Sequence, residues 1–228
     1  ILVKFSQLAI DFPEIKEMDV NPLIFDGDSA VAVDARIILD SERITKTAKP
    51  HDHLVIAPYP HKYMDEWKLK DGTTVVLRPI KPEDEALLNE LFKSLSEETM
   101  RFRFFQILKD VSHETLVRYC HLDYDREVAI VAETQKEKRR IIGVGRIVAE
   151  PGRKSGEFAV VVGDEWQGQG LGSKLMDCII KIGEDMGMKT IYGLISSNNT
   201  KMLNLCKKKG FKLEPFDEEL IKATLSTP

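Results

Sequence analysis

The feature that most constrains this chain is a glycine-rich turn between an apolar segment and an amphipathic one. Residues 158–162 read Phe-Ala-Val-Val-Val, and Gln167-Gly-Gln-Gly-Leu-Gly172 follows shortly after. From Leu171 to Ile182 apolar residues recur every three or four positions, which predicts a helix that starts inside the turn. The first amide groups of a helix lack partners and the helix dipole attracts negative charge, so this order favours an anion-binding site.

Composition excludes several classes of protein. The chain has 43% hydrophobic and 31% charged residues with a formal net charge of −4, which is typical of a soluble globular protein without general attraction for nucleic acid. No apolar run approaches the roughly 20 residues that span a bilayer, and no signal peptide is present. The three cysteines are far apart and without CxxC spacing, so we expect a cytoplasmic protein that binds neither nucleic acid nor membrane.

The pattern along the chain predicts three regions. Residues 1–45 contain a helical stripe and a hairpin around Asp26-Gly-Asp28, too little to bury a core alone. Residues 46–70 are rich in proline and histidine; we expect a linker without regular structure and no metal site at His51, His53 or His61. The chain begins at Ile1 rather than Met, so we expect a part of a longer protein.

Residues 71–228 alternate strand and helix patterns and form the third region. The expected order is strand, helices, three strands, helix, strand, helix and two strands, which predicts an α/β domain with one sheet. The expected strands are 73–80, 127–132, 141–148, 157–162, 191–195, 211–213 and 220–225. The expected helices are 83–92, a short one after Ser96, 113–120, one from Leu171 to about Gly187, and 199–209.

This order, the glycine turn and the later segment Ser197-Asn-Asn-Thr-Lys-Met to Gly210-Phe211 resemble the GNAT acetyltransferases over roughly residues 68–228. The resemblance implies a mixed, mainly antiparallel central sheet with flanking helices. It also implies acetyl-CoA as co-substrate, with its pyrophosphate on the glycine turn. Asn199 fits both contact with the pantetheine arm and an ordinary helix N-cap. The residues assigned to acetyl-CoA are Val160, Val161, Val162, Gln167, Gly168, Gln169, Gly170, Leu171, Gly172, Ser173 and Asn199.

Glu157 is the candidate catalytic residue. An amine must lose a proton as it attacks a thioester, and a carboxylate next to the thioester accepts that proton directly or through water. Its neighbours Phe158, Ala159 and Val160 are apolar, which predicts a partly desolvated carboxyl; the alternative is a surface glutamate at the start of a strand. An amide N–H within 160–162 would bind the thioester oxygen. Cys206 stands where the family often has a tyrosine acid, and serves either as that acid or as a buried small residue.

The N-terminal region resembles the end of the ATP-grasp domain of ADP-forming acyl-CoA synthetases. The resemblance rests on Asp19-Val-Asn-Pro-Leu23 and Ala32-Val-Asp-Ala-Arg36. It implies that Asn21 and Asp34 would hold nucleotide-bound magnesium in a complete domain, since both offer oxygen ligands. The nucleotide-binding bulk would lie upstream, so for this chain we favour a structural remnant without a metal.

Further segments resemble one GNAT subfamily, the protein lysine acetyltransferases fused to an ADP-forming acyl-CoA synthetase-like region. The resemblance implies that the acceptor is a protein lysine of an AMP-forming acyl-CoA synthetase. Near the expected site, Asp123, Asp125 and Glu127 form either an acidic mouth for a basic substrate or a charged turn. The segments are His53-Leu-Val-Ile-Ala-Pro-Tyr-Pro60, Leu77-Arg-Pro-Ile-Lys-Pro-Glu-Asp84, Arg103-Phe-Phe105 and Asp123-Tyr-Asp-Arg-Glu127.

Other functions fit the same residues. The domain could acetylate a small amine instead of a protein. It could also bind acyl-CoA without turnover and regulate a larger synthetase, or the chain could be the C-terminal part of an ADP-forming acyl-CoA synthetase. The sequence leaves the acyl-chain preference and the oligomeric state open.

Overall fold

A computed structural model of the chain describes residues 2–27, 29–41, 44, 57–106, 111–134 and 138–227. It divides into two compact units, Ile1–Pro58 and Tyr59–Pro228. His51, His53 and the basic residue Lys136 lie outside the described residues. No helix among the described residues is long and apolar enough to cross a membrane.

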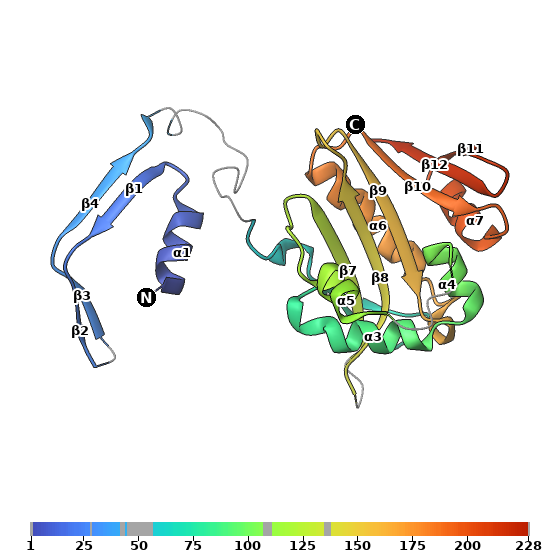
Figure 1. The fold of residues 1–228 in the computed structure, drawn as a ribbon, viewed down its shortest axis with the longest axis horizontal. Helices are drawn as coiled ribbons and strands as arrows, with labels where there is room; N and C mark the ends of the chain where they lie inside the picture. Colours follow the sequence, from blue (N-terminus) through green and yellow to red (C-terminus); the bar gives the residue numbers. More distant parts are fainter. Residues whose placement is uncertain are drawn as a thin grey trace. The chain divides into compact units, whose positions relative to one another are not determined.

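The first unit contains one helix and two small antiparallel pairs of strands (Figure 1). Helix α1 spans Leu2–Asp11, and β2 (Leu23–Asp26) pairs with β3 (Ser29–Ala32) as the sequence predicts. The structure adds β1 (Ile15–Val20) and β4 (Ala35–Leu39), which pair with each other. The sequence did not predict them because β1 alternates only weakly and its partner lies beyond the hairpin.

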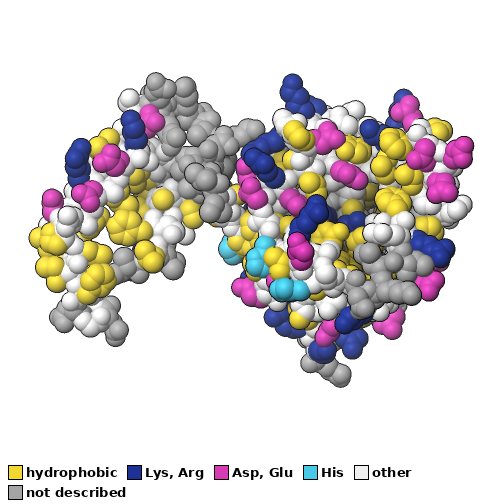
Figure 2. Space-filling view, in the orientation of Figure 1, with side chains coloured by type: hydrophobic (Ala, Val, Ile, Leu, Met, Phe, Trp, Pro, Cys, Tyr) yellow, Lys and Arg dark blue, Asp and Glu magenta, His cyan; other side chains and the backbone are white. Residues whose placement is uncertain are grey.

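Every residue of this unit whose burial the structure describes is at least partly exposed. Large apolar side chains lie open to solvent, and the space-filling view shows them gathered over β2 and β3 (Figure 2). The described part of this unit therefore builds no core, as expected for so short a segment. The exposed apolar residues include Leu2, Phe12, Ile24, Phe25, Val31, Val33, Ile37 and Leu39.

The second unit is built on one eight-stranded sheet in the order β11-β12-β10-β9-β8-β7-β6-β5. All neighbours pair antiparallel except β9 and β10, which are parallel, so the predicted mixed, mainly antiparallel sheet is confirmed. The strands are β5 (Asp65–Lys68), β6 (Thr74–Pro79), β7 (Glu127–Thr134), β8 (Arg140–Ala149), β9 (Ser155–Val162), β10 (Thr190–Ser196), β11 (Lys212–Pro215) and β12 (Leu220–Ser226).

Helices cover both faces of this sheet and bury two apolar layers. The amphipathic helix α6 packs on one face, where its leucines and isoleucines meet Ile130, Ile147 and Phe158. On the other face α3 and its neighbours cover Ala129, Val131 and Val161. The helices are α3 (Glu85–Ser94), α4 (Glu97–Phe104), α5 (His113–Cys120), α6 (Leu171–Asp185) and α7 (Thr200–Lys208), with 3₁₀ turns η1 (His61–Tyr63), η2 (Pro82–Asp84) and η3 (Asp164–Trp166).

Part of the segment expected to lack regular structure belongs to this unit. Residues 61–68 form η1 and β5, and β5 pairs with β6 through Trp67 opposite Val75. Tyr59 also donates a hydrogen bond to the carbonyl of Pro79. The expectation failed because Asp-Glu-Trp-Lys shows no strand pattern by itself; β6 supplies the partner and the buried surface.

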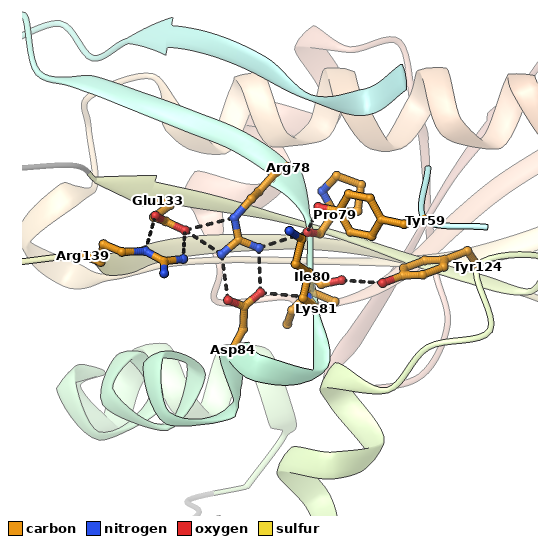
Figure 3. A network of polar contacts seen from close by, with 9 residues as sticks. All are labelled: Tyr59, Arg78, Pro79, Ile80, Lys81, Asp84, Tyr124, Glu133 and Arg139. Carbon is orange, nitrogen blue, oxygen red and sulfur yellow. Dashed lines mark hydrogen bonds and ion pairs between the residues drawn. The ribbon is translucent and has the colours of Figure 1, made fainter. Parts of the chain in front are cut away.

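A buried ionic network holds the end of β6 and η2 against β7 (Figure 3). Arg78 donates to both oxygens of Asp84 at 2.6 and 2.7 Å and to Glu133, which also accepts from Arg139 at 2.7 Å. The hydrogen bond from Arg139 lowers the pKa of Glu133 against the opposing effect of burial, and Arg78 lowers it further. Buried charges persist in proteins when they are paired in this way.

Candidate active site

The candidate site lies where the parallel strands β9 and β10 part. Their pairing covers only three positions, Ser155 to Glu157 on β9 opposite Thr190 to Tyr192 on β10. Beyond these, β10 continues along β12, and the described residues of β9 from Phe158 onward pair with β8 alone. The sheet is therefore open on one side of the Val-Val-Val segment that precedes the glycine turn.

The register of β8 and β9 directs free backbone groups into this opening. Gly163 donates to the carbonyl of Ile142, and the strands keep the same register back to Ala149 opposite Gly156. In an antiparallel pair the hydrogen-bonded positions alternate, so odd-numbered residues of β9 face β8 and even-numbered ones face away. The amide groups of Val160 and Val162 thus point toward the space that β10 has left, as a thioester oxygen or an amide-bearing ligand requires.

A cavity of about 370 Å³ occupies the opening. Strand β9, the glycine turn, the N-terminus of α7 and one side of α4 form its walls. Of the residues predicted to bind acetyl-CoA, the structure brings Val160, Val161, Val162, Gln167, Gly168, Gly172 and Asn199 together around it, along with the predicted base Glu157.

The remaining predicted residues lie in the turn and the first turn of α6. The side chain of Leu171 is buried in the core, so only its backbone can face a ligand. Gly170 has φ +91°, a conformation that L side chains rarely adopt, and a ring atom of Trp67 lies 3.2 Å from where a Cβ would stand. The carbonyl of Gln169 accepts from Lys70 at 3.4 Å, and Ser173 is half-buried on α6.

Gly172, unlike Gly170, has room for a side chain. It lines the cavity, and an added Cβ would make only ordinary contacts at 3.8 and 3.9 Å with Val162 and Leu205. The fold therefore does not require glycine at this position. A phosphate approaching the N-terminus of α6 does benefit from it, because the backbone is then unshielded.

Gln167 and Asn199 already have partners in the protein. The Gln167 amide donates to the carbonyl of Val162 at 3.3 Å, and its oxygen accepts from Lys201 at 3.1 Å. Asn199 caps α7: its side-chain oxygen accepts from the amide of Met202 at 3.1 Å. The N-cap role that the sequence offered for Asn199 is confirmed, and the cap also holds the residue at the cavity wall.

Glu157 sits at the apex of the opening, at the last position where β9 and β10 pair, beside Tyr192. Its side chain is exposed and lines the cavity, so the apolar surroundings expected from the sequence are not found. The reason is strand alternation: Phe158 and Val160 point to the opposite face, where they pack in or against the core with α6.

Sequence reasoning missed the wall that α4 contributes. Thr99, Phe102, Arg103 and Phe105 line the cavity together with Glu157. Arg103 and Phe105 belong to a segment that resembles the family, yet no local pattern shows which strand a short polar helix will cover. Asp164 anchors this helix through hydrogen bonds from Ser96 and Thr99, which lower its pKa against the effect of burial.

At two further places the structure favours one of the alternatives that the sequence left open. At residues 123–127 it favours the charged turn over the acidic mouth, because Asp125 pairs with Arg153 and Glu127 with Arg146. Cys206 is fully buried in the core, and burial raises the pKa of its thiol to about 12. Its surroundings favour packing over proton transfer.

In the first unit, the two residues that resemblance connects with magnesium lie at the junction between its strand pairs. Both are exposed, and the amide of Asn21 donates to the carbonyl of Asp34 at 3.2 Å. The pair is thus adjacent in space although the residues are separated by the β2–β3 hairpin.

In comparison with known proteins, the two compact units match different families. The acetyltransferase (GNAT) domain pattern matches residues 74–212, and the ATP-grasp domain pattern matches residues 1–39. The chain is 32% identical over 150 residues to an acetyltransferase of Pseudomonas aeruginosa, covering 64% of this chain and 81% of that protein. It is 27% identical over 171 residues to the acetyltransferase Pat of Mycolicibacterium smegmatis, covering 74% of this chain and 49% of that protein.

The N-terminal residues have a different relative. A stretch of 39 residues is 59% identical to the beta subunit of an ADP-forming acetate–CoA ligase of Pyrococcus furiosus, covering 17% of each protein. Among solved structures, the GNAT domain of the S. lividans PAT covers 75% of this chain and all of that one, with a TM-score of 0.69 at 23% identity, which supports the fold. The co-substrate of the second unit is acetyl-CoA, and the chain belongs to the GNAT acetyltransferase family.

Proposed function

We propose that this chain transfers the acetyl group of acetyl-CoA to a lysine side chain of a protein, an AMP-forming acyl-CoA synthetase. One observation carries the proposal: Glu157 stands at the apex of the β9–β10 opening, where the cavity meets an exposed side-chain carboxylate. The similarity to Pat and the match of residues 1–39 to a subunit of an acetate–CoA ligase support a protein acceptor.

In this proposal the pyrophosphate of acetyl-CoA lies on the turn at 167–173, against the N-terminus of α6. The pantetheine arm runs along β9 past Asn199, where the free amide groups of Val160 and Val162 offer hydrogen bonds. The thioester then reaches the Glu157 end of the cavity.

The reaction needs a single transfer without an acyl-enzyme. The neutral lysine amine attacks the thioester carbon, the developing oxyanion accepts a hydrogen bond from the amide of Val160, and Glu157 takes the proton of the amine. The carbon–sulfur bond then breaks, and the CoA thiolate leaves and takes a proton from water.

Glu157→Gln is expected to lower turnover by roughly 10²–10⁴-fold, because the amide cannot accept the proton. Acetyl-CoA affinity should stay unchanged, since the substitution preserves shape and lies beyond the thioester. Steady-state kinetics and calorimetry measure the two effects, and Glu184→Gln on the exposed side of α6 is the matched control. Near-normal turnover of Glu157→Gln would remove this residue from the mechanism.

The acceptor is tested by incubating the chain with labelled acetyl-CoA and an AMP-forming acetyl-CoA synthetase, followed by mass-spectrometric mapping of the modified lysine. A parallel panel of small amines separates the two acceptor classes. Label on one synthetase lysine supports the proposal. Label only on small amines favours an amine acetyltransferase, and tight acetyl-CoA binding without any transfer favours a sensor domain.

A further inference from the structure

The second unit contains three arginines at least partly buried near the sheet, and one of them lacks an acidic partner. Arg78 pairs with Asp84 and Glu133. Arg146 pairs with Glu127 and donates to the carbonyl of Tyr119. Within the residues that the structure describes, the half-buried Arg103 makes neither a hydrogen bond nor an ion pair, and its guanidinium only lies 4.9 Å from the ring centre of Phe104.

Arg103 lies on α4, which packs against β9. It lines the main cavity together with Glu157. It also borders a small second cavity with Ala159 and Val161, the residues that follow Glu157 on the same face of β9. A positive charge is therefore placed beside the end of the cavity where the thioester and the amine would meet.

Glu157 is the complementary charge. Among the described residues its carboxylate has no hydrogen bond or ion pair, and it lines the same cavity as Arg103. Several other charged or titratable groups near this region have partners: Arg146 with Glu127, Tyr192 with Glu150 at 2.6 Å, and Lys222 over the ring of Tyr192 at 4.5 Å. Asp164 and Lys201 also line the cavity and bind Thr99 and Gln167. Glu98 lines the cavity as well, but it lies in the first turn of α4, the helix that carries Arg103, whereas Glu157 comes from β9.

We propose that Arg103 is a positioning residue for Glu157: its guanidinium binds the Glu157 carboxylate once acetyl-CoA fills the cavity. The inference rests on the proposed role of Glu157. In the open cavity, water solvates the exposed Glu157 carboxylate and weakens its attraction to Arg103. A bound acetyl-CoA displaces that water, and the attraction between opposite charges strengthens as the local dielectric falls. The pair then holds the carboxylate toward the entering amine.

The electrostatic surroundings of Arg103 support this pairing. Burial lowers the pKa of Arg103, and the neighbouring charge of Arg146 lowers it further. Tyr119, Glu157 and Glu127 act in the opposite direction. Glu127 is already bound to Arg146. Of these two carboxylates, Glu157 is therefore the one that is available to stabilise the Arg103 cation.

A crystal structure of the full chain with acetyl-CoA tests the contact without any acceptor. We expect a guanidinium nitrogen of Arg103 within about 3.5 Å of a Glu157 oxygen, the range of a charge-assisted hydrogen bond. A guanidinium that instead binds the cofactor, or that stays apart from Glu157 in the complex, overturns the inference. This result does not depend on which amine the enzyme acetylates.

Kinetics test the consequence. Arg103→Met should lower kcat at least about tenfold, because a misplaced base transfers protons poorly, while the Kd for acetyl-CoA stays unchanged. Arg103→Lys should recover part of the loss, and Arg118→Met, an exposed arginine on α5, should have no effect. The double variant Arg103→Met/Glu157→Gln should be no slower than Glu157→Gln alone, since Arg103 acts through Glu157.

The outcomes separate this inference from the proposed function. Losses that multiply in the double variant show that Arg103 acts independently of Glu157 and contradict the inference. A wild-type chain that transfers acetyl groups only to small amines contradicts the protein acceptor, yet the double-variant comparison still holds with that amine. If no amine is acetylated, the acetyl-CoA complex alone decides the role of Arg103.

Discussion

At the scale of single residues, the charged side chains fall into two groups: those paired in the interior and those that line the cavity. Arg78 is fully neutralised by Asp84 and Glu133 in the interior, and Arg139 completes the network from the surface. Such a network contributes to stability only as a whole, because removal of one partner leaves other charges buried and unpaired. Among the residues that the structure describes, Arg103 and Glu157, by contrast, have no ion pair, and both line the cavity.

Arg78→Met is expected to lower the free energy of unfolding by about 3–5 kcal/mol at pH 7, because Asp84 would remain buried without a cation and Glu133 would keep only Arg139. The surface variant Lys138→Met, which breaks only the exposed pair with Glu90, should cost less than about 1 kcal/mol. Urea denaturation of both variants measures the difference. Equal losses would show that the network is not the source of stability.

The same network predicts a pH dependence. Hydrogen bonds from Arg139 and Arg78 hold the pKa of Glu133 in the folded state below its ordinary value of 4.5. This contribution to stability is therefore complete above pH 4.5 and is lost as the pH falls through the lower, folded value. Denaturation of Glu133→Gln and wild type between pH 7 and acid should show their difference shrinking in that range; a constant difference would contradict the assignment.

At the scale of elements, the segment from β9 through the glycine turn to α6 contains glycines in two different roles, one in the backbone conformation and one at the cavity. Gly170 needs its left-handed conformation and has the Trp67 ring against it. Gly172 has neither constraint, and it borders the cavity. A sequence pattern alone shows both as glycines of one turn, whereas the structure assigns one to the fold and favours a ligand role for the other.

Gly172→Ala should leave the free energy of unfolding within about 0.5 kcal/mol of wild type, since a methyl group makes only ordinary contacts there. It should weaken acetyl-CoA binding about tenfold, because the methyl group shields the backbone from the phosphates. Gly170→Ala should lose about 1–3 kcal/mol of stability through backbone strain. Calorimetric binding and thermal unfolding compare the two, and wild-type affinity of Gly172→Ala would place the pyrophosphate elsewhere.

At the scale of the whole molecule, the described residues form a core in the second unit and none in the first. The second unit buries two apolar layers around its sheet, and the first leaves large apolar side chains exposed. We propose residues 1–45 as an ATP-grasp remnant and residues 59–228 as the GNAT domain. The linker expected over 46–70 is shorter than the sequence indicates, because the contacts of Tyr59, η1 and β5 join the residues from Tyr59 onward to the second unit.

A fragment of residues 57–228 should therefore unfold in one cooperative transition and bind acetyl-CoA as tightly as the full chain. A fragment that starts at residue 71 removes β5 and should be less stable, because the edge of β6 loses its partner. Thermal unfolding and binding calorimetry of both fragments check this. A 57–228 fragment that aggregates would show that the first unit takes part in the fold of the second.

The sequence by itself determined the features that depend on neighbouring residues. The strand–turn–helix order and the caps at Ser96 and Asn199 follow from local patterns, and with the family resemblance they suffice for the fold class and the co-substrate. The tertiary structure decided which distant residues share the site. Strand β10 continues along β12 where it parts from β9, and α4 brings Arg103 to the cavity that Glu157 also lines. No local pattern contains these long-range pairings, because they arise from packing of the complete sheet.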